Sequence, residues 1–154
     1  MNKLILSIFT VFCITFTSSA QDSKTKAPHS IGLHAGAISG LGFSYRYWPS
    51  KLGVQITTIP IFRKNGNHFF SAGLSALYTL NEGEKVDLYG YLGNHILSTS
   101  KNPNVIYNVG VGFGFKINFL ESMDFNMQAG YGMYDLTNQF FTSLTGELGL
   151  YYHF

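Results

Sequence analysis

Histidine and serine are the side chains of this chain of 154 residues whose spacing could support nucleophilic catalysis. A serine hydroxyl becomes a useful nucleophile when a neighbouring base takes its proton, and histidine is the most frequent base. The nearest pairings along the sequence are His95 with Ser98 and His68 with Ser71. Neither pair has a third residue that would orient the base. We therefore expect no catalytic residues and no enzyme.

Metal and cofactor chemistry has little support in the sequence. His34, His68, His95 and His153 fall on separate predicted segments, without the close spacing that metal ligands usually show. The single cysteine, Cys13, lies in an apolar run near the N-terminus. The formal net charge is only +2, without a basic patch that would mark a nucleic-acid surface. We expect no metal site, no cofactor and no nucleic-acid partner.

The composition is unusual for a water-soluble domain. Charged residues make up 12% of the chain, whereas soluble domains carry about a quarter. Hydrophobic residues account for 45% and aromatic residues for 16%. So many aromatic residues exclude a disordered chain, and so few charges leave little with which to cover a solvated surface.

The first 20 residues have the pattern of a secretory signal peptide. Lys3 gives a positive start, residues 4–16 form an apolar run, and small residues lead to a cleavage site after Ala20. The apolar run is shorter than the roughly 20 residues that a transmembrane helix needs. Residues 21–29 are polar and predict a short leader in the periplasm. Removal of residues 1–20 would take Cys13 away, so we expect no disulfide in the mature chain.

The remaining residues, 30–154, alternate between apolar and polar or glycine positions, which is typical of strands with two different environments. Eight such segments follow one another: 30–37, 41–48, 52–57, 70–79, 86–97, 105–119, 123–134 and 143–154. Short turns such as residues 38–40 join them, and short links connect antiparallel neighbours. Pro60 cannot donate a backbone hydrogen bond, so we expect the third strand to end or bulge near residues 59–62. The sequence predicts an up-and-down meander.

Segment 86–97 fits this pattern least well. Tyr89 and Tyr91 fall on the face that we assign as polar, together with Asp87. A slip of one residue would turn every side chain of the segment to the other face. The register of this strand therefore stays open by one residue.

The distribution of charge indicates which face lies inside. The polar face carries most of the 17 glycines, and its charged residues are Arg46, Asp87, Lys116, Asp124 and Glu147. The apolar face carries none of the four charged residue types. The lumen of an eight-stranded barrel is only wide enough for side chains, and a charge facing the bilayer midplane costs about 2–4 kcal/mol. The sequence thus predicts an all-β fold: an eight-stranded antiparallel up-and-down transmembrane β-barrel over residues 30–154.

The five charged residues of the polar face form a candidate lumen network. We expect Arg46, Asp87, Lys116 and Asp124 to lie in the periplasmic half of the lumen and Glu147 nearer mid-height. They could act as an ion gate in a narrow pore, or as paired groups that fill the lumen. Because eight-stranded interiors are normally full and buried charges must be paired, we favour the filled lumen.

Two stretches resemble a known family. They are the run Gly40, Leu41, Gly42, Phe43, Ser44, Tyr45, Arg46, Tyr47, Trp48 and the ending Leu148, Gly149, Leu150, Tyr151, Tyr152, His153, Phe154. Both resemble the small outer-membrane β-barrels of Gram-negative bacteria, which include OmpA-like, OmpX-like and PorT-like proteins. The resemblance implies export through a cleaved signal peptide to the cell outer membrane, and insertion by the barrel assembly machinery. It also implies an assembly signal formed by Leu150, Tyr152 and Phe154, and a monomer surrounded by outer-membrane lipid.

The external links are short for this family, which argues against adhesion or receptor roles. They carry Arg63, Lys64 and Lys101, which could contact phosphates of lipopolysaccharide or simply be solvated surface cations. The function that we expect is structural or envelope-supporting, with a largely filled polar lumen. The alternatives are a narrow channel for ions or small solutes, an outer-membrane lipid-modifying enzyme and, last, a soluble ligand-binding barrel.

Overall fold

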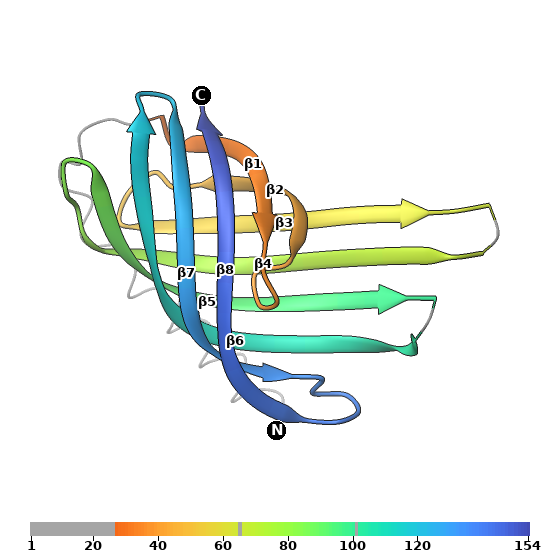
Figure 1. The fold of residues 1–154 in the computed structure, drawn as a ribbon. Coiled ribbons are helices and arrows are strands. Elements are labelled where there is room, and N and C mark those ends of the chain that lie inside the picture. The colour runs from red at the N-terminus through yellow and green to blue at the C-terminus, as the bar shows by residue number, and fades with distance from the viewer. Residues whose placement is uncertain (1–26, 65, 101) are drawn as a thin grey trace, which may run out of the picture.

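The computed structural model describes residues 27–64, 66–100 and 102–154 of the chain. The strands are β1 (His29–Ala35), β2 (Leu41–Tyr47), β3 (Leu52–Phe62), β4 (His68–Asn81), β5 (Val86–Thr99), β6 (Asn102–Leu120), β7 (Met123–Tyr134) and β8 (Phe141–His153). Each strand pairs antiparallel with the next, and β8 pairs with β1 to close the barrel (Figure 1). The predicted eight-stranded up-and-down barrel is confirmed. The predicted signal peptide, residues 1–20, lies outside the described residues, as does most of the leader at 21–29.

No helix in the described part of the chain is long and apolar enough to cross a bilayer.

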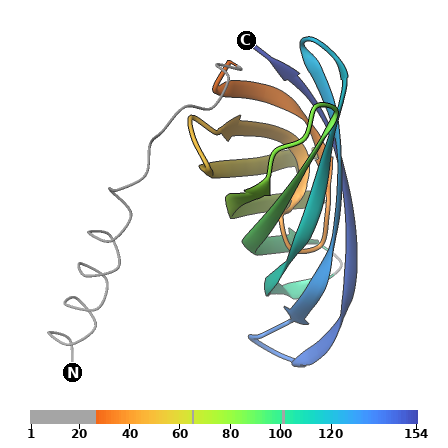
Figure 2. The same ribbon diagram turned by 90° about the vertical axis from the view of Figure 1, so that its left-hand side faces the viewer.

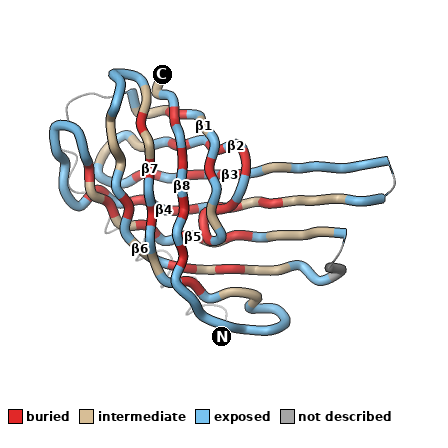
Figure 3. The backbone as a smooth tube through the Cα atoms, in the orientation of Figure 1, coloured by how far each residue is buried: buried red, intermediate tan, exposed pale blue. Residues whose placement is uncertain are grey.

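Over most of each strand, side chains alternate between the lumen and the outer surface. Along β2, exposed residues such as Phe43 and Tyr45 alternate with the buried Ser44 and Arg46. The uncertain register of β5 is resolved, because Asp87, Tyr89 and Tyr91 are all buried in the lumen. The tube in Figure 3 shows this alternation as short red and blue steps along the strands.

The burial pattern is the reverse of that in a soluble protein. Among the described residues only five hydrophobic side chains are buried: Ile38, Leu77, Tyr89, Tyr91 and Tyr151. Buried polar or charged side chains are more than three times as numerous and come from every strand. Large apolar side chains on the outer surface are open, for example Phe43 at 68% exposure. The polar core is inside and the apolar surface is outside.

The wall of the barrel has unequal height. Strands β1 and β2 have seven residues each, whereas β6 has 19. The pairing of β1 with β8 ends at Ala35 and Leu148, although β8 begins seven residues earlier, at Phe141 (Figure 1). The pairing of β2 with β3 likewise ends at Phe43 and Thr58. Beyond these points the wall continues through β3 to β8 without β1 and β2. Figure 2 shows that the blue β7 and β8 extend further from the C-terminal end than the orange β1.

The expected end of the third strand within residues 59–62 is confirmed, because β3 ends at Phe62. Pro60 itself lies inside the strand and pairs with Phe70 in regular register. The last partner of β3 on β2 is Thr58, so beyond that residue β3 has a neighbour on one side only. Proline is tolerated on such an edge, since its missing N–H is not needed for a second ladder.

Candidate functional site: the lumen and its inward-folded loop

The structure divides the five predicted lumen charges into two groups. Arg46, Asp87, Lys116 and Asp124 lie in the half of the barrel near His29 and Phe154, which we call the terminal half of the lumen. Glu147 lies apart from them, where strand β8 passes the end of β1. The two groups have different kinds of partner.

Arg46 organises the terminal half through neutral partners. Its Nε donates to Gln55 Oε1 at 2.7 Å, and its Nη1 donates to Asn126 Oδ1 at 2.6 Å. The guanidinium carbon lies 3.6 Å from the centroid of the Tyr151 ring. A delocalised guanidinium stacks well on an aromatic face and is less strongly hydrated than an ammonium, which suits a cation that is only 1% exposed.

The acidic residues of this half have partners of their own. Asp124 contacts the His153 ring and accepts a hydrogen bond from Asn126 Nδ2. Asp87 forms an ion pair with Lys116, with 2.7 Å between Oδ2 and Nζ. The Lys116 ammonium also lies 5.0 Å from the Trp48 ring centroid. The terminal half is thus filled by side chains that the strands themselves carry.

The other half of the lumen is filled by a loop. The segment that joins β1 to β2, residues 36–40, folds into the barrel, and we call it the lumen loop. Ile38 and Ser39 are both 0% exposed, although turns between strands usually lie on the surface. The turn is present but points inward, because lumen side chains satisfy its polar groups and because Ile38 meets a surface of glycines. A Cβ on Gly110 or Gly132 would come within 3.0 Å of the Ile38 side chain.

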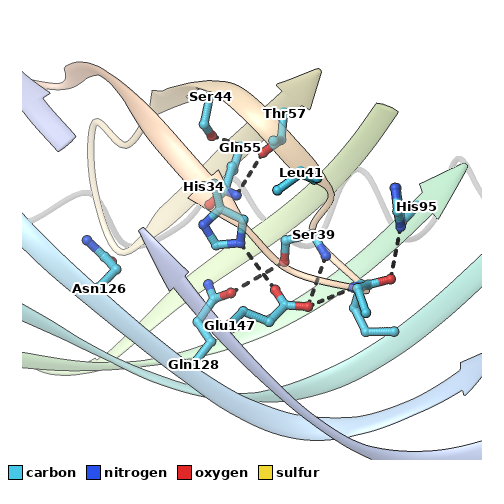
Figure 4. Close-up of polar contacts among 12 residues, drawn as sticks. His34, Ser39, Leu41, Ser44, Gln55, Thr57, His95, Asn126, Gln128 and Glu147 are labelled. Carbon is cyan, nitrogen blue, oxygen red and sulfur yellow. Dashed lines mark hydrogen bonds and ion pairs between the residues drawn. The ribbon is translucent and has the colours of Figure 1, made fainter. Parts of the chain in front are cut away.

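Glu147 is the charged anchor of the lumen loop (Figure 4). Its Oε1 accepts hydrogen bonds from the backbone N–H groups of Ile38, at 2.7 Å, and Ser39, at 3.2 Å. Its Oε2 lies 3.3 Å from His34 Nε2, and the other ring nitrogen of His34 lies 3.2 Å from the Tyr151 hydroxyl. Two successive backbone N–H groups form a small concave site that suits an anion, so the buried carboxylate is well satisfied.

Neutral side chains from four other strands hold the rest of the loop and Leu41, the first residue of β2 after it. The Ala37 carbonyl accepts from His95 Nδ1 and from Asn108 Nδ2, both at 3.0 Å. Ser39 Oγ donates to Gln128 Oε1 at 3.4 Å, and Leu41 N donates to Ser71 Oγ at 2.9 Å. Together with Glu147 on β8, these side chains come from β4, β5, β6 and β7.

Two glycines let the loop approach the wall this closely. Gly40 has a φ of 89°, in the left-handed region that favours glycine. A Cβ on Gly73 of β4 would lie 2.2 Å from the Ser39 carbonyl oxygen, well inside contact distance. A larger residue at position 73 would therefore displace the loop from its contact with β4.

The candidate serine and histidine pairs are exchanged relative to the prediction. His95 Nε2 lies 2.9 Å from Ser71 Oγ, and His68 Nε2 lies 3.1 Å from Ser98 Oγ. The reason is the register of β4 and β5, in which Ser71 faces Leu97 and Gly73 faces His95. Because His95 Nδ1 donates to a carbonyl, Nε2 of the neutral ring accepts from Ser71. This pair is buried beside the lumen loop, and it helps to anchor the loop.

The predicted surface sites lie at opposite ends of the barrel. Arg63 and Lys64 are exposed in the connection between β3 and β4, and Lys101 lies outside the described residues. Leu150, Tyr152 and Phe154 face outward from β8, and Phe154 N donates to the His29 carbonyl at 3.1 Å. Within residues 27–64, 66–100 and 102–154, no three histidine, cysteine or acidic side chains are grouped as a metal site.

Sequence spacing did not predict the inward fold of the loop, the burial of Ile38, or the contacts of His34 with Glu147 and of Asn108 with Ala37. A signal was present, because the apolar Ile38 sits in a turn bracketed by Gly36 and Gly40. Glycines on three other strands provide the space for that side chain. Their relation to Ile38 depends on the register of the closed barrel, so it could not be found from local spacing.

Comparison with known proteins gives a match at the level of structure. No family model matches the sequence, and no curated protein matches it. The crystal structure of the N-terminal β-barrel domain of Pseudomonas aeruginosa OprF matches with a TM-score of 0.53 and 15% identity, covering 84% of this chain and all of that one. The solution NMR structure of the de novo designed protein TMB2.3 matches with a TM-score of 0.44 and 10% identity, covering 86% of this chain and 98% of that one. The likeness to the OprF domain shows that this chain has the fold of a small eight-stranded β-barrel.

Proposed function

We propose that this protein is an integral barrel of the outer membrane of a Gram-negative bacterium, of the OmpA-like, OmpX-like and PorT-like kind. Its role is structural or envelope-supporting, it is not an enzyme, and its lumen is largely filled. The observation that carries the proposal is the inverted distribution of polarity. Apolar side chains cover the outer surface, while charged and polar side chains are buried in the lumen.

The outer surface has the chemistry of a membrane-spanning wall. Outward positions of the eight described strands carry no Asp, Glu, Lys or Arg. Aromatic side chains gather outward near the chain ends, including Tyr45, Tyr47 and Tyr152. Such residues favour the membrane interface, and a closed barrel leaves few backbone groups unpaired in lipid. These features support exposure to lipid over exposure to water.

The filled lumen supports a structural role over a channel. Arg46, Tyr89 and Tyr151 are almost completely buried in the terminal half, and Ile38 of the lumen loop occupies the other half. The Ser71 and His95 pair supports a protein without catalytic activity, because both side chains are buried and the loop covers them. A lipid substrate outside the barrel would have no access to Ser71.

Contacts with lipopolysaccharide are part of the proposal. Arg63 and Lys64 are exposed at the end of the barrel opposite the chain termini, where phosphate groups of the outer leaflet would lie. A triple variant with alanine at Arg63, Lys64 and Lys101 should copurify with less lipopolysaccharide than the parent. The matched control replaces Lys51 and Lys85, which lie in connections at the terminal end. Equal lipopolysaccharide in all three proteins would contradict this part of the proposal.

The main experiment is membrane fractionation of the expressed protein, followed by electrophoresis of heated and unheated samples. We expect the protein in the outer-membrane fraction, with different migration before and after heating because the folded barrel survives in the unheated sample. A soluble periplasmic or secreted protein would overturn the proposal. The proposed assembly signal is tested in the same way, since Phe154→Ala should lower the amount in the outer membrane and Phe141→Ala, at the other end of β8, should not.

A further inference from the structure

We propose that the lumen loop is a lid with Glu147 as its latch, and that release of the latch opens the lumen to small water-soluble molecules. The inference rests on the proposed function only in placing the loop at the end of the barrel that faces away from the periplasm. The starting observation is the way in which the loop is held. Within the described residues, its backbone bonds to the wall end on side chains and not on a strand ladder.

Glu147 is the strongest of these attachments. Among the residues that the structure describes, it is the only charged side chain that holds the loop, and one of its oxygens accepts two backbone N–H groups. Hydrogen bonds to an ionised acceptor are about twice as strong as neutral ones. The neutral contacts from His95 and Asn108 each replace one that water could make. Loss of the Glu147 charge should therefore shift the loop toward an open state.

The loop has the construction of a movable segment. Gly36 and Gly40 stand at its two ends, and the N–H of Gly36 donates to the carbonyl of Gly40 at 3.0 Å. This bond closes the loop on itself, so it can move as one unit. Gly40 and Gly42 both have positive φ values, and glycines at the ends of a lid absorb the backbone change of a hinge.

Ile38 is the part of the loop that seals the lumen. It is completely buried and packs with Leu77, Tyr89 and Tyr91 in the one hydrophobic cluster described inside the barrel. Ser75 lies next to it, because a Cβ on Gly93 would be 2.8 Å from Ser75 Oγ and 3.0 Å from Ile38 Cγ2. Ser75 Oγ is buried and makes no hydrogen bond, so a cysteine at this position removes no contact.

The experiment uses Ser75→Cys as a reporter beneath the lid. The chain has one native cysteine, Cys13, and protein without the reporter sets the background of labelling. A small water-soluble methanethiosulfonate reagent is added to the folded barrel, and the rate of labelling is measured. We expect slow labelling in the reporter protein, and a rate at least about tenfold higher when Glu147→Gln is added, because a charge-assisted hydrogen-bond pair is lost.

The matched control is Asp124→Asn in the same reporter protein. Asp124 and Glu147 are buried carboxylates of equal exposure, at 1% each, but Asp124 contacts His153 and Asn126 and not the loop. Labelling should stay at the parent rate in this control. An equal increase in both variants would mean that loss of any buried charge loosens the barrel, and would overturn the proposal.

A second variant keeps the proposal testable if Glu147→Gln fails to fold. Gly73→Ala leaves Glu147 intact but places a methyl group 2.2 Å from the Ser39 carbonyl oxygen, so it displaces the loop sterically. It should raise labelling of Ser75→Cys as Glu147→Gln does. Unchanged labelling in folded barrels of these variants would overturn the lid. Absence of the parent from the outer-membrane fraction would contradict the proposed function alone, because the labelling can be done in detergent.

Discussion

The two halves of the lumen are filled in different ways, one by strand side chains and the other by a loop. In the terminal half, strand side chains such as Arg46 and Tyr151 meet one another across the barrel. In the other half, the lumen loop supplies backbone N–H and carbonyl groups, and the wall supplies single side chains such as Glu147 to bind them. The side chains of the terminal half cannot leave the lumen unless the strands that carry them move. The lumen loop can leave the lumen without breaking any strand pairing.

The largest effect should come from the terminal half. Arg46→Ala removes two hydrogen bonds from a charged donor, to Gln55 Oε1 and Asn126 Oδ1, together with the stacking on Tyr151. Because hydrogen bonds of a charged group are worth about 1.5–3 kcal/mol each, we expect the free energy of unfolding to fall by about 3–5 kcal/mol. Urea unfolding of the refolded barrel, followed by the gel shift between heated and unheated samples, measures this. Arg63→Ala, at the exposed end, is the control, and an equal loss in both variants would show that the network is not special.

A smaller effect should follow from breaking the loop half at its anchor. Glu147→Ala leaves the N–H groups of Ile38 and Ser39 without their acceptor, but an opened loop can recover hydrogen bonds from water. We expect a loss of about 2–3 kcal/mol in the same unfolding measurement. A loss larger than that of Arg46→Ala would reverse the comparison, because the loop half would then be the more rigid one.

The glycines that surround Ile38, namely Gly93, Gly110 and Gly132, allow a separate test of how the lumen loop packs. A Cβ at Gly132 would lie 2.6 Å from Ile38 Cδ1, whereas a Cβ at Gly146 meets nothing within 4 Å. Gly132→Ala should destabilise the barrel by about 1–2 kcal/mol through overpacking. Gly146→Ala should be neutral, or stabilising by about 0.4–1 kcal/mol, because it restricts the unfolded chain. Thermal unfolding of the pair separates these outcomes, and equal behaviour would contradict the packing of Ile38.

The smallest effect concerns the ion pair at the margin of the terminal half. The side chains of Lys116 and Asp87 keep 14% and 6% of their surface exposed, so water partly screens their attraction. Lys116→Gln should lower the free energy of unfolding by about 1 kcal/mol or less. Raised salt in the same urea titration should reduce the difference between variant and parent. A difference that does not depend on salt would point to lost packing on Trp48 instead.

The elements that sequence patterns predicted well are those that local periodicity determines. The alternation of Ser44 and Arg46 with Phe43 and Tyr45 predicts both the strand and its faces, because strand side chains repeat every two residues. The direction of the lumen loop could not be predicted in this way. Its main anchor, Glu147, lies 109 residues from Ile38 in the sequence, so their contact exists only in the closed barrel.

The exchanged histidine and serine pairs have the same physical origin. Ser71 and His95 are 24 residues apart, and they meet because a particular register brings β4 beside β5. Spacing along the chain favoured Ser98 as the partner of His95, because it lies only three residues away. In a strand, however, residues three positions apart face opposite sides of the sheet, so their side chains do not meet. Pro60 is a local signal that needed no register, since β3 does end at Phe62, within the range of residues 59–62 that the proline predicted.

The connection from Ile38 to Glu147 also bears on the order in which the barrel assembles. Glu147 belongs to β8, the last strand of the chain, and the loop follows β1, the first. Until β8 arrives, the Ile38 and Ser39 N–H groups have no carboxylate to bind. Capture of the loop and closure of the seam between β1 and β8 should therefore occur together, as a late and slow step that depends on contacts of long sequence separation. A chain that stops before Glu147 would form hairpins without a sealed interior.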